Sequence, residues 1–277
     1  MSAPVAFPGP AGTHTAAAAA ALFPSAQLVP LGGFRAVADA VANADAAHGV
    51  LPIESSLAGA VAETHDLLYE RDLSIVAETV LPIRHCLAGI EPVALSEIRL
   101  VRSHPSAFEQ CRSLLARLSG ASVVPTPTTA AAAQQTAEEG DPSVAVIVGS
   151  EGASLYGLTV LADDVGDGPA FTRFVSIASY TRVDIRGRPR TAFTFVTKHS
   201  PGALHAAIGP FARAGLDLER LVSRPLPATP WKYRFDAVVD GHPLDPVVRL
   251  ALREMRALTR ELRVTGVYEA HDPEDET

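Results

Sequence analysis

The sequence contains few of the residues that mark disulfide scaffolds or metal sites. Its 277 residues include only two cysteines, Cys86 and Cys111, and one tryptophan. Two cysteines at this separation have no metal-ligand spacing, and their scarcity favours a reducing compartment. The nine histidines are scattered, with no pair at ligand spacing on one helix. We therefore expect no metal site.

Long apolar runs and an excess of positive charge are also missing. The longest apolar run near the N-terminus, Ala16–Phe23, is too short to span a membrane and follows no basic residue. A formal net charge of −8 argues against nucleic acid as a partner. It does not exclude a small anionic substrate, which needs only a local positive pocket. With 47% hydrophobic residues, we expect a globular cytoplasmic protein that does not bind membranes.

One stretch of the chain combines a turn with a strand that carries two polar side chains. In Asp167–Ile177, Gly168 and Pro169 favour a turn, and the aromatic and β-branched residues after them predict a strand. Thr172 and Arg173 lie where the turn becomes a strand, so they should point to opposite faces and serve different purposes. By themselves, these residues fit an edge strand with one polar pair.

A glycine turn near the N-terminus separates a predicted strand from a predicted helix. Val5–Phe7 forms the strand, Pro8–Gly12 the turn, and Thr13 or Thr15 caps the helix. Free backbone N–H groups at a helix start can bind an anion. The spacing matches neither a dinucleotide nor a P-loop motif, so a plain connection explains this turn equally simply.

Three polar residues follow a second short strand. Glu54, Ser55 and Ser56 come directly after the predicted strand His48–Ile53. Polar side chains at a strand end in an α/β sheet are typical of a ligand site. Ser55 or Ser56 could equally cap a helix, and the two roles are compatible.

The predicted elements divide the chain into two α/β lobes and a C-terminal unit. Residues 1–180 form the lobes, and extended structure over Leu73–Cys86 leads into the second lobe at about 77–165. Residues 181–190 resemble a linker. The order over 191–270 is β-α-β-β-α-β, the ferredoxin-like arrangement. We expect the acidic tail, residues 271–277, to fray.

Taken together, the motifs resemble those of bacterial prephenate dehydratase followed by a regulatory ACT domain. The resemblance extends from about residue 5 to 268 and rests on short segments in the family's order. They are Gly9–Thr13, Pro52–Ser56, Ser103–Pro105 with Gln110-Cys111, Tyr156–Leu158, the intact Thr172-Arg173-Phe174, Gly202–Leu204 and Ser223–Pro225.

The resemblance implies a periplasmic-binding-protein-like pair of lobes with the ligand between them, and a ferredoxin-like ACT domain. It implies a carbon–oxygen lyase that converts prephenate to phenylpyruvate in phenylalanine biosynthesis, without a cofactor. The implied catalytic residues are Thr172, Arg173, Ser55 and Glu54, and the implied substrate-binding residues are Gly12, Thr13, His14, Ser56, His104 and Phe174. Arg173 would orient a substrate carboxylate or pair with Glu54 or Asp164. His104 would contact the ligand or start a helix.

The same resemblance predicts regulation. The implied effector is phenylalanine, bound between two ACT domains, so we expect a homodimer or homotetramer. The residues matched to effector motifs are Gly202, Ala203, Leu204, Ser223, Arg224 and Pro225.

Four positions depart from the family pattern. Ser55 and Ala170 stand where the family has asparagines, His14 replaces an aromatic residue, and Val222 replaces a glutamate. The first three touch the expected active site. Two alternatives therefore stay open: a prephenate decarboxylase that keeps the 4-hydroxyl, and a non-catalytic sensor of an aromatic amino acid.

Overall fold

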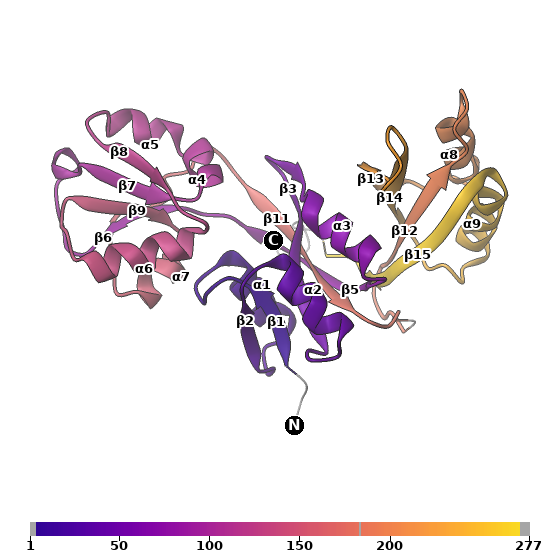
Figure 1. The fold of residues 1–277 in the computed structure, drawn as a ribbon, viewed down its shortest axis with the longest axis horizontal. Helices are drawn as coiled ribbons and strands as arrows, with labels where there is room; N and C mark the ends of the chain where they lie inside the picture. The colour runs from indigo at the N-terminus through magenta and orange to yellow at the C-terminus, as the bar shows by residue number, and fades with distance from the viewer. Residues whose placement is uncertain (1–3, 183, 272–277) are drawn as a thin grey trace.

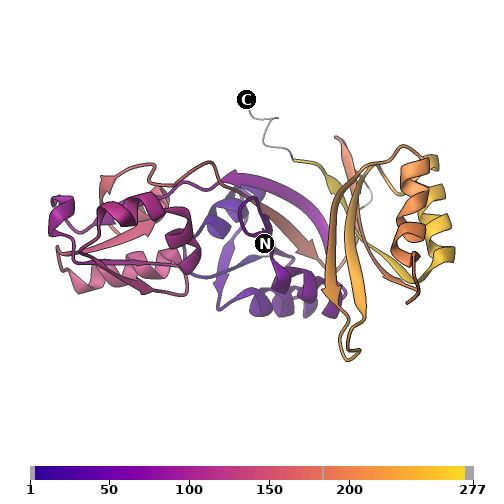
Figure 2. The same ribbon diagram turned by 90° about the horizontal axis from the view of Figure 1, so that it is seen from above.

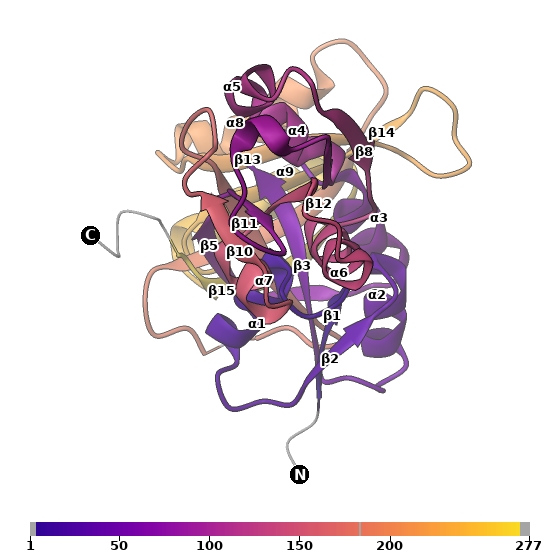
Figure 3. The same ribbon diagram turned by 90° about the vertical axis from the view of Figure 1, so that its left-hand side faces the viewer.

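The molecule is elongated, with three parts side by side along its length (Figure 1). The computed structural model describes residues 4–182 and 184–271. The first lobe lies in the middle, the second lobe at one end and the C-terminal unit at the other. Figure 3 looks along the molecule from the second lobe, with β3 (His48–Ser55) and β11 (Phe171–Ala178) near its centre.

The first lobe is built on part of a ten-stranded sheet. Its remaining elements are β1 (Val5–Pro8), α1 (His14–Leu22), β2 (Leu28–Leu31), α2 (Phe34–Ala42), β4 (Gly59–Ala60), α3 (Ala62–Glu70) and β5 (Ser74–Pro82). The strand order here is β5-β11-β3-β1-β2, with β4 paired to β3. β11 runs antiparallel to both of its neighbours, β3 and β5.

Two hydrophobic clusters cover the faces of this sheet. On one face Phe7 and Phe174 pack with the alanines of α1. On the other, Leu51 and Ile177 pack with Val37 of α2 and Leu67 of α3. Successive strand residues alternate between these clusters, as the pleat requires.

The second lobe has a sheet of its own. Its elements are β6 (Cys86–Gly89), the 3-10 helix η1 (Leu95–Glu97), β7 (Leu100–Ser103), α4 (Pro105–Gln110), α5 (Arg112–Arg117), β8 (Ser122–Pro125), α6 (Thr129–Glu139), β9 (Val144–Val148), α7 (Ser150–Leu155) and β10 (Thr159–Ala162). The strand order is β10-β6-β9-β7-β8. The helices α4 and α5 are separated at Cys111, which is fully buried.

The C-terminal unit has the predicted β-α-β-β-α-β order. Its elements are β12 (Pro189–Thr197), α8 (Ala203–Arg213), β13 (Leu218–Pro225), β14 (Tyr233–Asp240), α9 (Pro246–Leu258) and β15 (Thr259–Glu269). The strand order is β13-β14-β12-β15, and both helices cover the outer face (Figure 2). On the inner face, Ala192, Val238 and Tyr268 belong to the same cluster as the core of the first lobe.

The C-terminal sheet is continuous with that of the first lobe. β15 pairs in parallel with β5 at Gly266 and Ile75. β12 begins at Pro189, inside the segment 181–190 expected to be a linker. His271 is not frayed: its backbone N–H donates to Glu78, and its ring accepts from the Val80 N–H. The rest of the predicted tail lies outside the described residues.

Candidate functional site

The topology gathers the predicted site segments at one place between the lobes. In the first lobe, the turn after β1, the end of β3 and the start of β11 lie at the same edge of the sheet. The second lobe has a matching edge, formed by the ends of β7 and β9 and the start of β6. Carboxyl ends of strands are where open α/β sheets bind ligands. We refer to the space between these two edges as the interlobe cleft.

The strand register separates the four predicted catalytic residues into two pairs. Thr172 lies opposite Ser55, and Arg173 lies opposite Glu54. Directly opposed residues share a face, and adjacent residues do not. Thr172 also lies opposite Leu81, which lines a groove of the interlobe cleft. Thr172 and Ser55 therefore face the cleft, whereas Arg173, the next residue along the strand, faces away from it as predicted.

The polar groups at the end of β3 form a turn. The Ser55 hydroxyl accepts from the Leu57 and Ala58 N–H groups at 3.3 and 3.4 Å. Ser56 pairs with Phe171 through both its backbone N–H and its hydroxyl. A hairpin to β4 follows, so the helix cap considered for Ser55 and Ser56 is wrong. Within the described residues, the Thr172 hydroxyl makes no hydrogen bond and is available to a ligand.

Arg173 and Glu54 lie on the opposite face, toward the C-terminal unit. Arg173 Nη1 is 2.9 Å from Glu78 Oε1, and its Nε is 3.6 Å from Glu54 Oε2. Of the two roles expected for Arg173, the structure supports the ion pair with Glu54. The Arg173 guanidinium therefore points away from the cleft, into contacts with Glu54 and Glu78.

The N-terminal turn contacts the second lobe. Gly12 has a φ of +83°, and a Cβ there would lie 3.3 Å from the Gly152 Cα. The Tyr156 hydroxyl donates to the Ala11 carbonyl at 3.3 Å. Thr13 caps α1 by accepting from the Ala16 N–H. Gly12 therefore sets how closely the lobes approach, beyond its expected contact with substrate.

His14 lies beside a second histidine that the sequence did not single out. The rings of His14 and His85 have centroids 5.9 Å apart, edge to face. Burial, and secondarily the nearby His85, lowers the pKa of His14 to about 4. Burial also lowers the pKa of His85, against a hydrogen bond from its Nε2 to Gln110 Oε1 at 3.0 Å. Both rings are therefore neutral at pH 7.

A groove of about 350 Å³ lies where the lobes meet. The N-terminal turn and Arg84 line it from one side, and residues 149–152 line it from the other. Arg84 is exposed and supplies positive charge to the groove. No motif marked Arg84, because it lies at the end of the extended segment that joins the two lobes.

Two predicted substrate contacts have structural roles. His104 caps α4: its Nδ1 is 2.7 Å from the Ser106 hydroxyl and accepts from the Ser106 N–H. The helix-start role considered for His104 is thus the one that the structure supports. Phe174 is 2% exposed and fills the cluster beneath α1. This burial supports a core role for Phe174, and its contact with substrate stays a prediction.

The residues matched to effector motifs separate into two places. Gly202, Ala203 and Leu204 line a pocket of about 400 Å³ at the start of α8, with Lys232 and Arg260 nearby. Gly202 caps the helix with a φ of +75°.

The second effector segment, Ser223–Pro225, does not line this pocket within one chain. Arg224 instead forms two hydrogen bonds, of 3.1 and 2.6 Å, with the carboxylate of Asp66 on α3. Burial raises the pKa of Asp66, but hydrogen bonds from Arg224 and Arg234 outweigh it and hold that pKa below its usual value. Ser223 and Pro225 are exposed on the same strand.

Metal-binding clusters and membrane-spanning helices are both absent from the part of the chain that the structure describes. No group of three or more His, Cys, Asp or Glu residues in it has a geometry that could hold a metal ion. Nor does any of its helices have both the length and the apolar character needed to cross a bilayer.

Comparison with known proteins identifies the family. Residues 5–182 match the family model described as prephenate dehydratase. An Arabidopsis thaliana arogenate dehydratase/prephenate dehydratase is 33% identical over 95% of this chain and 72% of its own length.

Two solved structures share the fold over nearly the whole chain, each with a TM-score of 0.88. One is a prephenate dehydratase from Arthrobacter aurescens in complex with L-Phe, 32% identical over 96% of this chain and 90% of its own. The other, described as a quorum-quenching acylase, is 31% identical over 98% of this chain and 99% of its own. With its cleft, its intact Thr172-Arg173-Phe174 segment and these matches, the chain belongs to the prephenate dehydratase family.

Proposed function

We propose that this protein converts prephenate to phenylpyruvate, water and carbon dioxide. The observation that carries this proposal is the Thr172 hydroxyl, which faces the interlobe cleft beside Ser55 and has no partner among the described residues. The family membership of the chain gives this arrangement its chemical context.

The reaction needs a donor at the leaving oxygen. As the ring carboxylate of prephenate leaves as CO2, the electrons of that C–C bond move into the ring, and the C–O bond at the 4-position breaks. Hydroxide is a poor leaving group and must gain a proton or a strong hydrogen bond. Because a threonine hydroxyl is a very weak acid, Thr172 acts as an oriented hydrogen-bond donor to the departing oxygen, and solvent supplies the proton that completes the water molecule. Aromatisation of the ring supplies the driving force.

The surrounding residues bind and orient the substrate. Prephenate carries two carboxylates, and Arg84 places a cation in the groove beside the N-terminal turn. The backbone N–H groups at Thr13 and His14 add donors at the start of α1. His14 also lines the groove, and because its ring is neutral at pH 7 it adds no further charge there. Glu54 and Arg173 pair on the opposite face of β3 and β11, where they hold the ends of these two strands in place.

Product identification tests this function. The purified protein, without added metal or nucleotide, is expected to convert prephenate to a compound with the absorbance of phenylpyruvate. Thr172→Val should lower kcat at least about 100-fold, the lower range for loss of one oriented hydrogen-bond donor at a developing charge, with little change in KM. Thr172→Ser keeps the hydroxyl and should retain most of the activity. A valine variant of normal rate would exclude Thr172 from the mechanism.

The same experiment separates the alternatives. A decarboxylase yields a dihydro product that keeps the oxygen, which mass spectrometry distinguishes from phenylpyruvate by one water. A sensor yields no product. Since the Arabidopsis relative is named for arogenate as well as prephenate, arogenate, the amino counterpart of prephenate, should be assayed in parallel.

We further propose that residues 191–270 form an ACT domain that binds phenylalanine. Their element order and the pocket at Gly202–Leu204 support this assignment. The L-Phe complex of the Arthrobacter relative supports the effector. Because Ser223–Pro225 does not line the pocket of its own chain, we propose that a second copy supplies this segment in a homodimer or homotetramer. Sedimentation with and without phenylalanine tests the assembly, and a monomer in both conditions would contradict it.

A further inference from the structure

We propose that Arg220 is a positioning residue for the dehydration. It holds the Glu54–Arg173 pair in place on the face of the strands opposite to Thr172 and Ser55. The inference rests on the proposed function. It concerns a residue of the C-terminal unit, outside the lobes that form the cleft. We call the contact between this unit and the first lobe the seam.

Arg220 reaches across the seam from β13. Its Nη1 lies 3.6 Å from Glu54 Oε2, the same oxygen that Arg173 approaches at 3.6 Å. The side chain of Arg220 is 8% exposed, and that of Glu54 36%. One carboxylate oxygen therefore lies between two guanidinium groups, one from each side of the seam.

Arg173 is also drawn toward a second carboxylate. Its Nη1 lies 2.9 Å from Glu78 Oε1, which Arg190 Nη1 approaches at 2.7 Å. Glu78 and Arg190 are both almost fully buried, and Arg190 also contacts Glu219 and Asp240. Without Arg220, the described cation that remains near Glu54 would be Arg173, which already makes a shorter contact with Glu78.

This ionic cluster is joined to the reacting groups through adjacent backbone. Glu54 precedes Ser55, and Arg173 follows Thr172, in register across the same two strands. A shift of the Glu54 carboxylate therefore moves the strand ends that aim the two hydroxyls. Because a misplacement of about 1 Å can cost about 100-fold in rate, even a partial shift should lower kcat.

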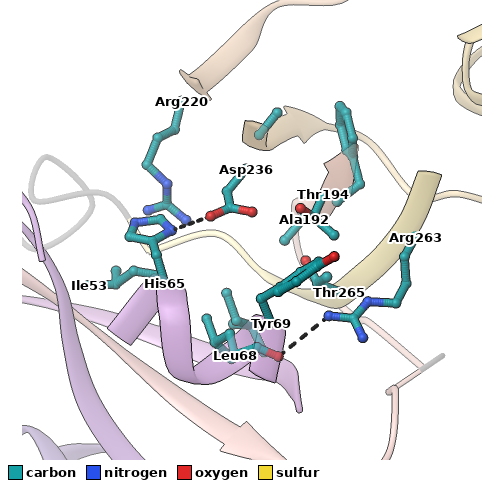
Figure 4. Close-up of a pocket in the computed structure, with 13 residues that line it drawn as sticks. Ile53, His65, Leu68, Tyr69, Ala192, Thr194, Arg220, Asp236, Arg263 and Thr265 are labelled. Atoms are coloured by element: carbon teal, nitrogen blue, oxygen red, sulfur yellow. Dashed lines mark hydrogen bonds and ion pairs between the residues drawn. The ribbon is translucent and has the colours of Figure 1, made fainter. Parts of the chain in front are cut away.

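The geometry of the seam supplies a matched control. Arg220 and Arg263 both line a small cavity at the seam, where His65 contacts Asp236 (Figure 4). Arg263 also crosses the seam, but it pairs with Asp72 and lies 5.5 Å from the Tyr69 ring centroid. It has no contact with Glu54 or Arg173. Both arginines therefore join the two units, and only Arg220 touches the cluster behind the site.

The test compares Arg220→Met, Arg220→Lys and Arg263→Met with prephenate as substrate. Arg220→Met should lower kcat about tenfold with KM within about twofold, since it disturbs orientation and not the binding surface. Arg220→Lys should recover most of the loss, because it returns a positive charge near Glu54. Arg263→Met should leave both constants within about twofold of wild type.

Circular dichroism would confirm that each variant folds. If Arg220→Met does not fold, Arg220→Gln replaces it, with the same loss of kcat expected. A normal kcat in the folded Arg220 variant, or an equal loss in Arg263→Met, would overturn the positioning role. An inactive wild type would instead refute the proposed function, and the role with it.

Discussion

Glu78 offers a severe test of how the ionic cluster contributes to stability. The perturbation is Glu78→Gln, which removes the charge and keeps the shape. Glu78 Oε1 accepts contacts from Arg173, Arg190 and the backbone of His271, and its side chain is 1% exposed. The substitution leaves two arginines without the anion that they share.

The magnitude follows from burial. Breaking a buried ion pair by removing one partner costs about 3–5 kcal/mol. Arg190 retains Glu219 and Asp240, and Arg173 retains Glu54, so we expect a smaller loss in the free energy of unfolding, about 2–3 kcal/mol. At about 2–4 °C per kcal/mol for a domain of roughly 150–250 residues, Tm should fall by about 4–12 °C.

Thermal unfolding followed by circular dichroism measures the effect. The matched control is Glu70→Gln, which breaks the solvent-exposed pair of Glu70 with Arg35, whose side chains are 36% and 53% exposed. That pair should contribute less than about 1 kcal/mol. Equal shifts of Tm in the two variants would refute the reasoning, because burial would then have no influence on the contribution of the carboxylate.

Three further substitutions probe the N-terminal turn and the effector pocket. Gly12→Ala and Gly59→Ala both place alanine at positive φ, but only the methyl at 12 meets another residue, with Leu155 Cδ2 2.9 Å away. Gly12→Ala should therefore raise KM for prephenate and lower Tm further, and equal effects would exclude the lobe contact as the cause. His14, with its pKa lowered to about 4 from 6.5, is protonated in the unfolded chain before it is in the native one. Stability should thus fall as pH drops from about 6.5 to 4, by up to about 1.4 kcal/mol per pH unit, and urea unfolding of His14→Phe should show a shallower fall. In the C-terminal unit, Gly202→Leu should abolish the calorimetric heat of phenylalanine binding, whereas Gly215→Leu, also at positive φ but at the other end of α8, should leave it unchanged.

Local patterns were sufficient to predict the elements that carry the site. Residues of β11 alternate between faces, so the opposite directions of Thr172 and Arg173 followed from sequence alone. The chemistry of helix starts predicted Thr13 or Thr15 as the cap of α1, and the structure has Thr13 in that place. The β-α-β-β-α-β order of the C-terminal unit could be predicted because apolar and polar residues alternate in its strands and its helices have a distinct apolar face.

Contacts between distant segments were not predictable in this way. Which way Arg224 points depends on Asp66, 158 residues earlier. That Phe174 fills the core depends on α1, whose alanines pack against it. Helix α3 was missed because its mixed polarity gives no clear helical period. The strands β2 and β10 were missed because each has only four residues, too few to show a period.

The place of β11 has a consequence for how the chain folds. It lies between β3 and β5, yet the whole second lobe separates it from β5 in sequence. During synthesis, one edge of β3 and one edge of β5 therefore stay unpaired until residues 171–178 leave the ribosome. Unpaired strand edges can pair with other chains and so promote aggregation. Because non-local strand pairing is slow, the strand that carries Thr172 should be among the last to join its sheet. The Thr172 hydroxyl would then reach the cleft only after the second lobe has formed, so a chain stalled earlier in folding has an incomplete cleft.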